Sequence, residues 1–143
     1  SNFAPGPHVM AHLAKAAARF FDHVELIEMH HESKVDAPSG TAITTARKMA
    51  EGRAEPFHRA AAQRETVEGT RGGAVEGVTI HSVRLPGLVA HQAVIFGGPG
   101  ETLTIRHDSI SRESFMPGVI LAVKDVMGRQ ELVLGLETLI GIE

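Results

Sequence analysis

A strand, a turn and a helix follow one another in the first third of the chain, and this unit constrains the fold most. Alternating apolar side chains predict a largely buried β-strand over residues 23–30. Residues 36–40 (Asp-Ala-Pro-Ser-Gly) are typical of a turn. Ser39 or Thr41 is expected to cap a helix over about residues 41–52. A strand followed so closely by a helix favours an α/β domain in which the helix packs back onto a sheet.

The other apolar patterns place this unit between an N-terminal helix and a series of strands. No sustained period runs through residues 53–76, which we expect to form a long, mobile loop. The last two predicted strands are joined by Gly-Gly-Pro-Gly, which favours an antiparallel hairpin. The predicted elements are a helix over 7–21, strands over 23–30, 77–84, 88–96 and 101–110, helices over 41–52 and 115–127, and a short helix or strand over 131–142. We therefore expect an α/β (α+β) domain with a mixed, largely antiparallel sheet of about four strands and helices packed on one face.

The composition argues against several classes of protein. The chain has 143 residues, no cysteine and a formal net charge of −3, so it has no disulfide framework, no thiolate metal site and no basic stripe for nucleic acid. No apolar run approaches the roughly 18–20 residues that would span a membrane, and the first residues do not resemble a secretory signal. We expect a domain-sized protein of the cytoplasm. Because the chain lacks an initiator Met, we also expect a fragment of a longer protein.

Two adjacent imidazoles and an ammonium precede the predicted helix start. His30 and His31 lie where the strand ends, and Lys34 follows in the loop that leads to residues 39–41 (Ser-Gly-Thr). An imidazole can transfer a proton near neutral pH, a lysine supplies positive charge, and the backbone N–H groups at a helix start bind anions. Together these groups predict a site that holds a carboxylate or a phosphate and protonates an atom beside it.

Each of these features has a simpler explanation when it is taken alone. A histidine pair at a strand end is more often structural or solvated, and a Ser-Gly-Thr sequence is more often only a helix cap. Glu28 and Asp36 flank the pair and offer carboxylates that would orient an imidazole. His8 and His12 have the spacing of helical metal ligands but lack the glutamate of the His-Glu-x-x-His motif, so we assign them to a helix surface or an interdomain face. The nine histidines keep a metal-binding module open as an alternative.

The run from residue 28 to residue 42 resembles the signature of the dihydrodipicolinate reductase (4-hydroxy-tetrahydrodipicolinate reductase) family, which acts in the diaminopimelate route to lysine. Its pattern is Glu-x-His-His-x-x-Lys-x-Asp-Ala-Pro-Ser-Gly-Thr-Ala. The similarity covers nearly the whole chain, through Ser1-Asn2-Phe3, Ser82-Val83-Arg84, His91, Gly100-Glu101, His107, Ser111-Arg112-x-x-Phe115 and Gly118. The family's N-terminal Rossmann domain, with its Gly-rich dinucleotide loop, has no counterpart in this sequence.

The resemblance implies a reaction and a set of residue roles. A cyclic unsaturated imine dicarboxylate is reduced by hydride from NADH or NADPH, and a proton is added to the neighbouring carbon. His30 matches the family's proton donor, and Lys34 matches the residue that acts with it in catalysis. His31, Gly40 and Thr41 match substrate-binding positions, and no metal ligand is implied. The alternative is a non-catalytic module that binds a dicarboxylate or a metal on the same fold.

The resemblance also implies how the chain is organised. Residues 1–110 match a substrate-binding and oligomerisation domain, and residues 111–143 match a C-terminal helical segment that would return to a nucleotide-binding domain. Asn2 and Phe3 match a hinge that touches the cofactor, which would otherwise be bound by that other domain. The family assembles as a homotetramer through the sheet of this domain. No nucleic-acid or membrane partner is implied, and the chain by itself is expected to be inactive.

Overall fold

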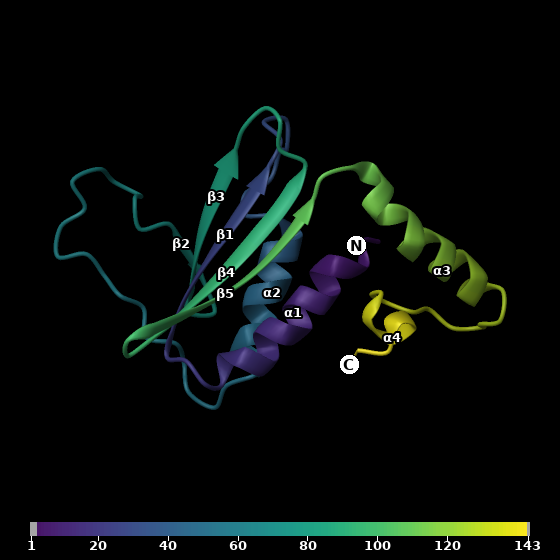
Figure 1. Cartoon of the computed structure of the whole chain (residues 1–143), viewed down its shortest axis with the longest axis horizontal. Helices are drawn as coiled ribbons and strands as arrows, with labels where there is room; N and C mark the ends of the chain where they lie inside the picture. The colour runs from purple at the N-terminus through teal and green to yellow at the C-terminus, as the bar shows by residue number, and fades with distance from the viewer. Residues whose placement is uncertain (1–2, 143) are drawn as a thin grey trace.

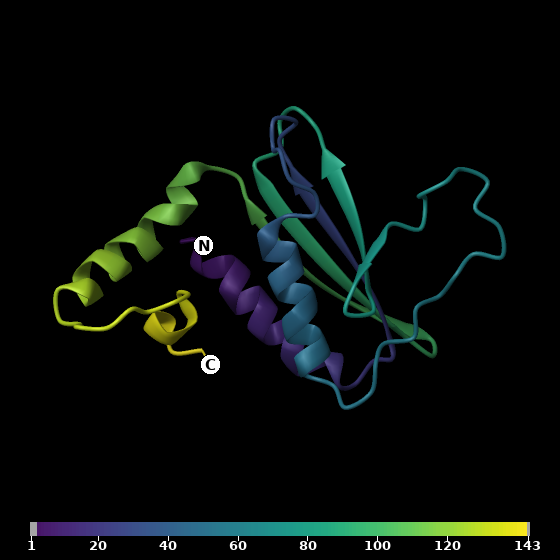
Figure 2. The same cartoon turned by 180° about the vertical axis from the view of Figure 1, so that it is seen from behind.

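A mixed β-sheet lies at the centre of the structure, a computed structural model that describes residues 3–142. The elements are α1 (Pro5–Ala18), β1 (His23–His30), α2 (Gly40–Glu51), β2 (Gly73–Val75), β3 (Val78–Arg84), β4 (Ala90–Gly98), β5 (Glu101–Ser109), the short 3-10 helix η1 (Arg112–Phe115), α3 (Met116–Val126) and α4 (Glu137–Ile140). The five strands follow the order β2-β3-β1-β4-β5, with β1 parallel to β3 and antiparallel to β4. Helices α1 and α2 lie side by side on one face of this sheet (Figures 1 and 2). The predicted fold class is confirmed.

The hydrophobic core lies between the sheet and these two helices. The even-numbered side chains of β1 face the helices, and the strand register sets Leu26 opposite Ile80 of β3 and Val94 of β4. Phe96 is fully buried and stacks on Phe21, with the two ring centroids 5.5 Å apart. Removing these large apolar side chains from water supplies the main driving force for packing the helices onto the sheet. In the described part of the chain, no helix lies on the opposite face of the sheet (Figure 2).

Small residues let α1 and α2 lie close together. Ala11 and Ala14 are buried on α1, and Ala42 and Ala46 are buried on α2. The first turn of α1 contains proline, which is favourable there because the missing N–H would have no partner inside the helix. α2 begins after Ser39, whose Oγ accepts a hydrogen bond from the backbone N–H of Ala42 at 3.2 Å. The predicted cap is therefore Ser39 rather than the residue two positions later.

One strand was not expected. β2 lies inside residues 53–76, which the sequence predicted as a loop, and it pairs antiparallel with the edge of β3. Three residues are too few to show the alternating pattern by which the longer strands were found. The rest of that segment is irregular but attached to the sheet, because Phe57 is buried and Arg59 Nε donates to Thr79 Oγ1 at 3.0 Å.

Beyond β5 the chain forms α3, which stands away from the sheet, and α4, which turns back toward α1 (Figure 1). A Cβ atom on Gly118 of α3 would lie only 1.7 Å from the carbonyl oxygen of Phe3, so this close approach requires glycine. The exposed large apolar side chains of this part are Ile110, Met116, Ile120, Val123, Val126, Met127, Leu132 and Leu134. The tail predicted as a short helix or strand contains the helix α4. Within residues 3–142 no helix is long and apolar enough to cross a membrane.

Candidate active site

A cavity of about 670 Å³ lies between the N-terminal ends of α1 and α2 and the end of β1. Its lining includes His30, Lys34, Gly40, Thr41 and Phe3, all of which the sequence assigned to the site. The C-terminal segment forms another part of the wall. The cavity has the size that holds a small organic ligand.

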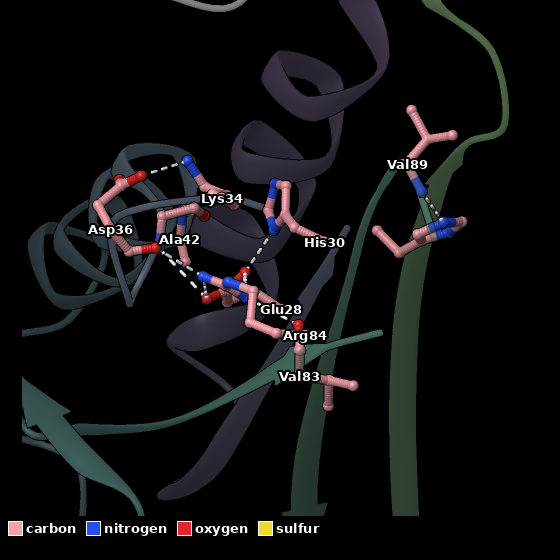
Figure 3. Close-up of polar contacts among 10 residues, drawn as sticks. Glu28, His30, Lys34, Asp36, Ala42, Val83, Arg84 and Val89 are labelled. Carbon is pink, nitrogen blue, oxygen red and sulfur yellow. Dashed lines mark hydrogen bonds and ion pairs between the residues drawn. The ribbon is translucent and has the colours of Figure 1, made fainter. Parts of the chain in front are cut away.

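His30 is the last residue of β1 and points toward the helix-covered side of the sheet. Its ring Nδ1 lies 2.5 Å from Oε2 of Glu28, whose side chain is fully buried. The second ring nitrogen lies on the side away from Glu28 (Figure 3). Burial lowers the pKa of His30 below its ordinary value, and the opposing attraction of Glu28 does not restore it. His30 is therefore an imidazole that releases a proton readily and has one nitrogen free of Glu28.

Glu28 is held as a carboxylate by the groups around it. Burial favours its protonated form, but hydrogen bonds from Arg84, Ser82 and His30 hold the pKa of Glu28 below its ordinary value. The guanidinium of Arg84 binds both carboxylate oxygens, at 2.8 and 3.1 Å. The suggestion that Glu28 orients an imidazole is thus matched by a direct contact with His30.

Lys34 reaches the cavity from the loop that follows β1. Its Nζ lies 2.5 Å from Oδ1 of Asp36, and this hydrogen bond lowers the pKa of the exposed Asp36 carboxyl below its ordinary value. Asp36 therefore contacts the lysine and not an imidazole. Its backbone carbonyl oxygen accepts a hydrogen bond from Nη2 of Arg84 at 2.7 Å. The loop that carries Lys34 is tied in this way to the group that holds Glu28 (Figure 3).

The start of α2 supplies backbone donors to the same cavity. The N–H groups in the first turn of a helix have no partner inside the helix and carry the positive end of its dipole. Ser39 caps this turn through the N–H of Ala42, and Gly40 and Thr41 follow at the cavity wall. A Cβ atom on Gly40 would have no atom within 4 Å, so open space borders the backbone there. The arrangement suits an anionic group placed against the helix start.

The structure does not bring every predicted residue to the cavity. His31 is exposed, its Nδ1 lies 3.3 Å from Oγ of Ser33, and it is not among the residues that line the cavity. Phe3 does line the cavity, whereas Asn2 lies outside the described residues. The cavity therefore gathers the proposed proton donor, the cation and the helix start, and leaves the second histidine on the surface.

Two cavity groups, His8 and Glu137, and the neighbouring Lys48 were not assigned to the site from the sequence, because they meet only in the folded chain. Glu137 of α4 lies with Oε1 3.0 Å from Nδ1 of His8 and 2.8 Å from Nζ of Lys48. Burial raises the pKa of Glu137, but hydrogen bonds from Lys48, its own backbone and His8 lower it to about 2. His8, which the sequence placed on a helix surface or interdomain face, thus contacts the C-terminal segment. No local motif signals a contact between the two ends of the chain.

Four of the nine histidines have carboxylate partners within residues 3–142. The pairs are His8 with Glu137 at 3.0 Å, His30 with Glu28 at 2.5 Å, His81 with Glu25 at 2.5 Å and His91 with Asp108 at 2.6 Å. Among residues 3–142 no three His, Asp or Glu side chains are grouped so that they could hold a metal ion. The histidine content therefore gives no support to a metal centre in this part of the chain.

Comparison with known proteins identifies relatives of this chain. The family model described as "Dihydrodipicolinate reductase, C-terminus" matches residues 6–140. The 4-hydroxy-tetrahydrodipicolinate reductase of Lysinibacillus sphaericus is 54% identical over 139 residues, which are 97% of this chain and 52% of the relative. The enzyme of the same name from Geobacillus thermodenitrificans is 57% identical over 136 residues, which are 95% of this chain and 51% of the relative.

A solved structure agrees with these relatives. It is dipicolinate-bound dihydrodipicolinate reductase from Paenisporosarcina sp. TG-14, with a TM-score of 0.83 and 52% identity over 96% of this chain and 52% of that chain. The chain thus spans about half the length of the proteins that it matches. The similarity noted from the run of residues 28–42 is confirmed over almost the whole sequence. The chain belongs to the dihydrodipicolinate reductase family, and it corresponds to the C-terminus that the family model describes.

Proposed function

We propose that this chain is the substrate-binding domain of an oxidoreductase that reduces dihydrodipicolinate, a cyclic unsaturated imine dicarboxylate, to tetrahydrodipicolinate with NADH or NADPH. The observation that carries the proposal is that His30, Lys34 and the start of α2 border one cavity. A dianionic substrate that gains a hydride and a proton needs a cation, backbone N–H donors and a proton donor. The reductase names of the relatives and the dipicolinate in the similar structure support this choice. We place the reaction in the diaminopimelate route to lysine and in the cytoplasm.

Each group at the cavity has a role in this proposal. The N–H groups of Gly40 and Thr41 bind one carboxylate of the substrate at the positive end of α2. Lys34 neutralises the charge of the ring substituents and acts together with His30. His30 gives a proton to the carbon next to the one that receives hydride, a contribution worth roughly 10²–10⁴ in rate. We also propose His31 as a substrate contact, although in the structure it is exposed and lies outside the residues that line the cavity.

The nicotinamide cofactor is bound, in this proposal, mainly by the half of the reductase that this chain does not match. Phe3 lines the cavity and is 41% exposed, and together with Asn2 it forms the hinge that touches the cofactor. Residues 111–143 return to the nucleotide-binding domain, and the exposed apolar side chains of α3 are the surface that this domain would cover. We therefore expect the chain alone to bind substrate without reducing it.

Isothermal titration calorimetry with pyridine-2,6-dicarboxylate tests the proposed substrate site. We expect binding by the unaltered chain and a loss of about tenfold or more in affinity for Lys34→Ala, because each charge-assisted hydrogen bond contributes roughly 1.5–3 kcal/mol. Lys15→Ala is the matched control, since Lys15 lies on α1 with its Nζ 3.8 Å from Glu51 and does not line the cavity. His31→Ala tests the second histidine. Equal affinity for the unaltered chain, Lys34→Ala and His31→Ala would refute this assignment.

A reductase assay separates the enzyme from a non-catalytic dicarboxylate-binding module. In a full-length reductase that carries this domain, we expect NADH or NADPH oxidation that Lys34→Ala abolishes. A full-length protein that binds pyridine-2,6-dicarboxylate but never oxidises either nucleotide would support the module instead. Elemental analysis of the same preparation tests whether a metal accompanies the protein.

We also propose that four copies of the chain assemble through the helix-free face of the sheet. Ile27 and Ile95 are half-buried on this face, Ala93 beside them is buried, and a shallow cavity of about 350 Å³ opens over the two isoleucines. The same face carries Glu25 and His81, which bind each other, so a second copy of the sheet would cover a surface that is part apolar and part charged.

A further inference from the structure

Both carboxylate oxygens of Glu28 are engaged by donors from different parts of the fold (Figure 3). Oε1 accepts from Nη2 of Arg84 at 2.8 Å and from the backbone N–H of Ser39 at 3.3 Å. Oε2 accepts from Nη1 of Arg84 at 3.1 Å and lies 2.5 Å from Nδ1 of His30. An ionised carboxylate can only accept hydrogen bonds. Nδ1 of His30 must therefore carry the proton in this contact.

Arg84 connects the three parts of the cavity that the proposed function uses. Through Glu28 it reaches His30 and the start of α2, and through the carbonyl oxygen of Asp36 it reaches the loop that carries Lys34. Within residues 3–142 the Nε atom of Arg84 is the one buried side-chain nitrogen or oxygen without a hydrogen-bond partner. A buried ion pair pays a desolvation cost that apolar residues of similar size avoid. A gain in folding stability therefore does not explain the ion pair of Glu28 and Arg84. The positions that the pair imposes on the groups around the cavity do explain it.

We propose that Glu28 and Arg84 are positioning residues that keep the proton of neutral His30 on Nδ1, so that Nε2 faces the cavity unprotonated and takes up a proton when a dicarboxylate binds. This inference rests on the proposed function, because it describes how the same site accepts its anionic ligand. Neither residue needs to touch the ligand. Their effect passes through the orientation and the protonation state of His30.

The coupling between ligand binding and the protonation of His30 follows from the charges in the cavity. An unprotonated Nε2 presents a lone pair, which repels a carboxylate, whereas a protonated Nε2 donates a charge-assisted hydrogen bond to it. Burial keeps His30 neutral in the empty site, so the ligand brings the proton with it from solvent. In catalysis the Nε2–H bond breaks as the substrate C–H bond forms, while the hydride of NADH or NADPH supplies the two electrons. His30 returns to the Nδ1–H tautomer, and Glu28 holds it ready for the next proton.

Several titratable or charged groups near His30 determine the electrostatic potential at its ring. They are Glu28 on β1, Lys34 on the following loop, Arg84 on β3, His91 on β4, His107 on β5, His8 on α1 and Glu137 on α4. Among residues 3–142, Glu28 alone accepts a hydrogen bond from the ring. The substitution Glu28→Gln therefore changes the one group that sets the tautomer, and it also removes one negative charge beside the ring.

The geometry dictates what Glu28→Gln does to His30. Oε1 faces two groups that can only donate, Nη2 of Arg84 and the N–H of Ser39, whereas Oε2 faces one such donor, Nη1 of Arg84, and the ring of His30, which can also accept. The position of Oε1 therefore favours the amide oxygen of glutamine. The amide NH₂ then takes the position of Oε2 and donates to Nδ1 of His30. Nδ1 becomes an acceptor, and the proton of neutral His30 moves to Nε2. Glu25→Gln is a matched control on the opposite face of β1, because Glu25 binds His81 at 2.5 Å and Arg71 at 2.7 Å in the same way.

Long-range ¹H–¹⁵N correlation spectra of the ¹⁵N-labelled chain show which nitrogen of each histidine is protonated. His30→Asn assigns the His30 signals by their loss. We expect the Nδ1–H tautomer in the unaltered chain and in Glu25→Gln, and the Nε2–H tautomer in Glu28→Gln. An Nε2–H tautomer of His30 in the unaltered chain would overturn the proposal. That result needs no variant to fold, so the proposal stays testable if Glu28→Gln does not.

Calorimetry with pyridine-2,6-dicarboxylate in buffers of different ionisation enthalpy measures the proton uptake. At about pH 7, where the lowered pKa of His30 leaves its ring mostly neutral, we expect net proton uptake on ligand binding by the unaltered chain and by Glu25→Gln. Glu28→Gln should bind with almost no uptake, because its Nε2–H is already present. Uptake unchanged in a folded Glu28→Gln would also overturn the proposal. Failure of the unaltered chain to bind the ligand would instead refute the proposed function, and the tautomer spectra would still decide this inference.

Discussion

Oε1 of Glu137 lies 2.8 Å from Nζ of Lys48, a residue 89 positions earlier in the chain. The same oxygen lies 3.0 Å from Nδ1 of His8, so one carboxylate bridges α1 and α2 at the edge of the cavity. α4 has only four residues and has no buried residues of its own. The ion pair is therefore a principal attachment of the C-terminal segment to the two-helix layer.

This attachment predicts acid sensitivity. Burial works against it, but Lys48, the backbone and His8 lower the pKa of Glu137 to about 2, from 4.5 for a free glutamate. The stabilisation is therefore complete above about pH 4.5 and is lost as the pH falls toward about 2. We expect it to contribute about 1–2 kcal/mol to the free energy of unfolding, after allowance for solvent. Urea denaturation across this pH range measures the contribution. The variant Glu137→Gln should lose the part of the unfolding free energy that changes with pH in this range.

The control for this prediction is Glu51→Gln. Glu51 also ends near a lysine, but the Nζ of Lys15 is 3.8 Å away and both side chains are largely exposed. We expect this variant to keep the pH dependence of the unaltered chain. The same loss of pH dependence in both variants would show that the attachment at Glu137 has no special role.

Gly40→Ala should separate ligand binding from stability. Gly40 is the first residue of α2, and a Cβ atom there would meet no atom within 4 Å. Alanine suits a helix better than glycine, so the free energy of unfolding should stay constant or rise by up to about 1 kcal/mol. The added methyl group would occupy the space beside the backbone donors, so we expect roughly tenfold weaker binding of pyridine-2,6-dicarboxylate by calorimetry. Gly73→Ala, in the edge strand β2 and equally open, should leave the affinity unchanged.

Ser39→Ala should weaken ligand binding and folding stability together. The Ser39 side chain accepts from the N–H of Ala42, and the residue is 2% exposed, so the variant loses a buried cap of α2. We expect a loss of about 1 kcal/mol in the free energy of unfolding, measured in urea, and a measurable loss of ligand affinity. Ser111→Ala is the comparison, because Ser111 caps the short helix η1 through the N–H of Glu113 on the surface. If Ser111→Ala lowered the ligand affinity as much as Ser39→Ala does, that result would contradict a specific role for the start of α2.

Ile95→Asp should dissociate the proposed tetramer. Ile95 lies on the helix-free face of the sheet, where a carboxylate would be buried without a partner in the interface. Light scattering is expected to give four copies for the unaltered chain and one copy for this variant. Leu13→Asp, on the exposed side of α1, should remain tetrameric. A monomer of the unaltered chain at micromolar concentration would contradict this assembly.

Local patterns predicted much of the fold and the centre of the site. The strand β1 and the helix α2 were found from their apolar periods, and Ser39 was found as one of two possible caps. These features depend on residues within one or two turns of each other, which a sequence shows directly. The short strand β2 escaped prediction because it forms only against β3 and has no period of its own.

The groups that organise the cavity depend on pairing between distant parts of the chain. Arg84 lies 56 residues beyond Glu28, and its guanidinium meets the carboxylate only because the two strands are neighbours in the sheet. The sequence also placed His31 beside His30 in the site, although alternation along an extended chain sends consecutive side chains to opposite sides. The exposure of His31 follows from that geometry.

The parallel pairing of β1 with β3 sets His30 opposite Arg84 in the register. Parallel neighbours end at the same edge of a sheet, and strand register, not the connection, decides which residues meet there. The segment between α2 and β2 starts at the opposite end of the sheet, where Arg53 donates to the carbonyl oxygens of Ala18 and Phe21, and runs out beyond the sheet (Figure 2). Insertions or deletions within that segment can therefore accumulate during evolution while the acid–base group keeps its geometry, which makes the connection the natural place for species-specific adaptation of this domain.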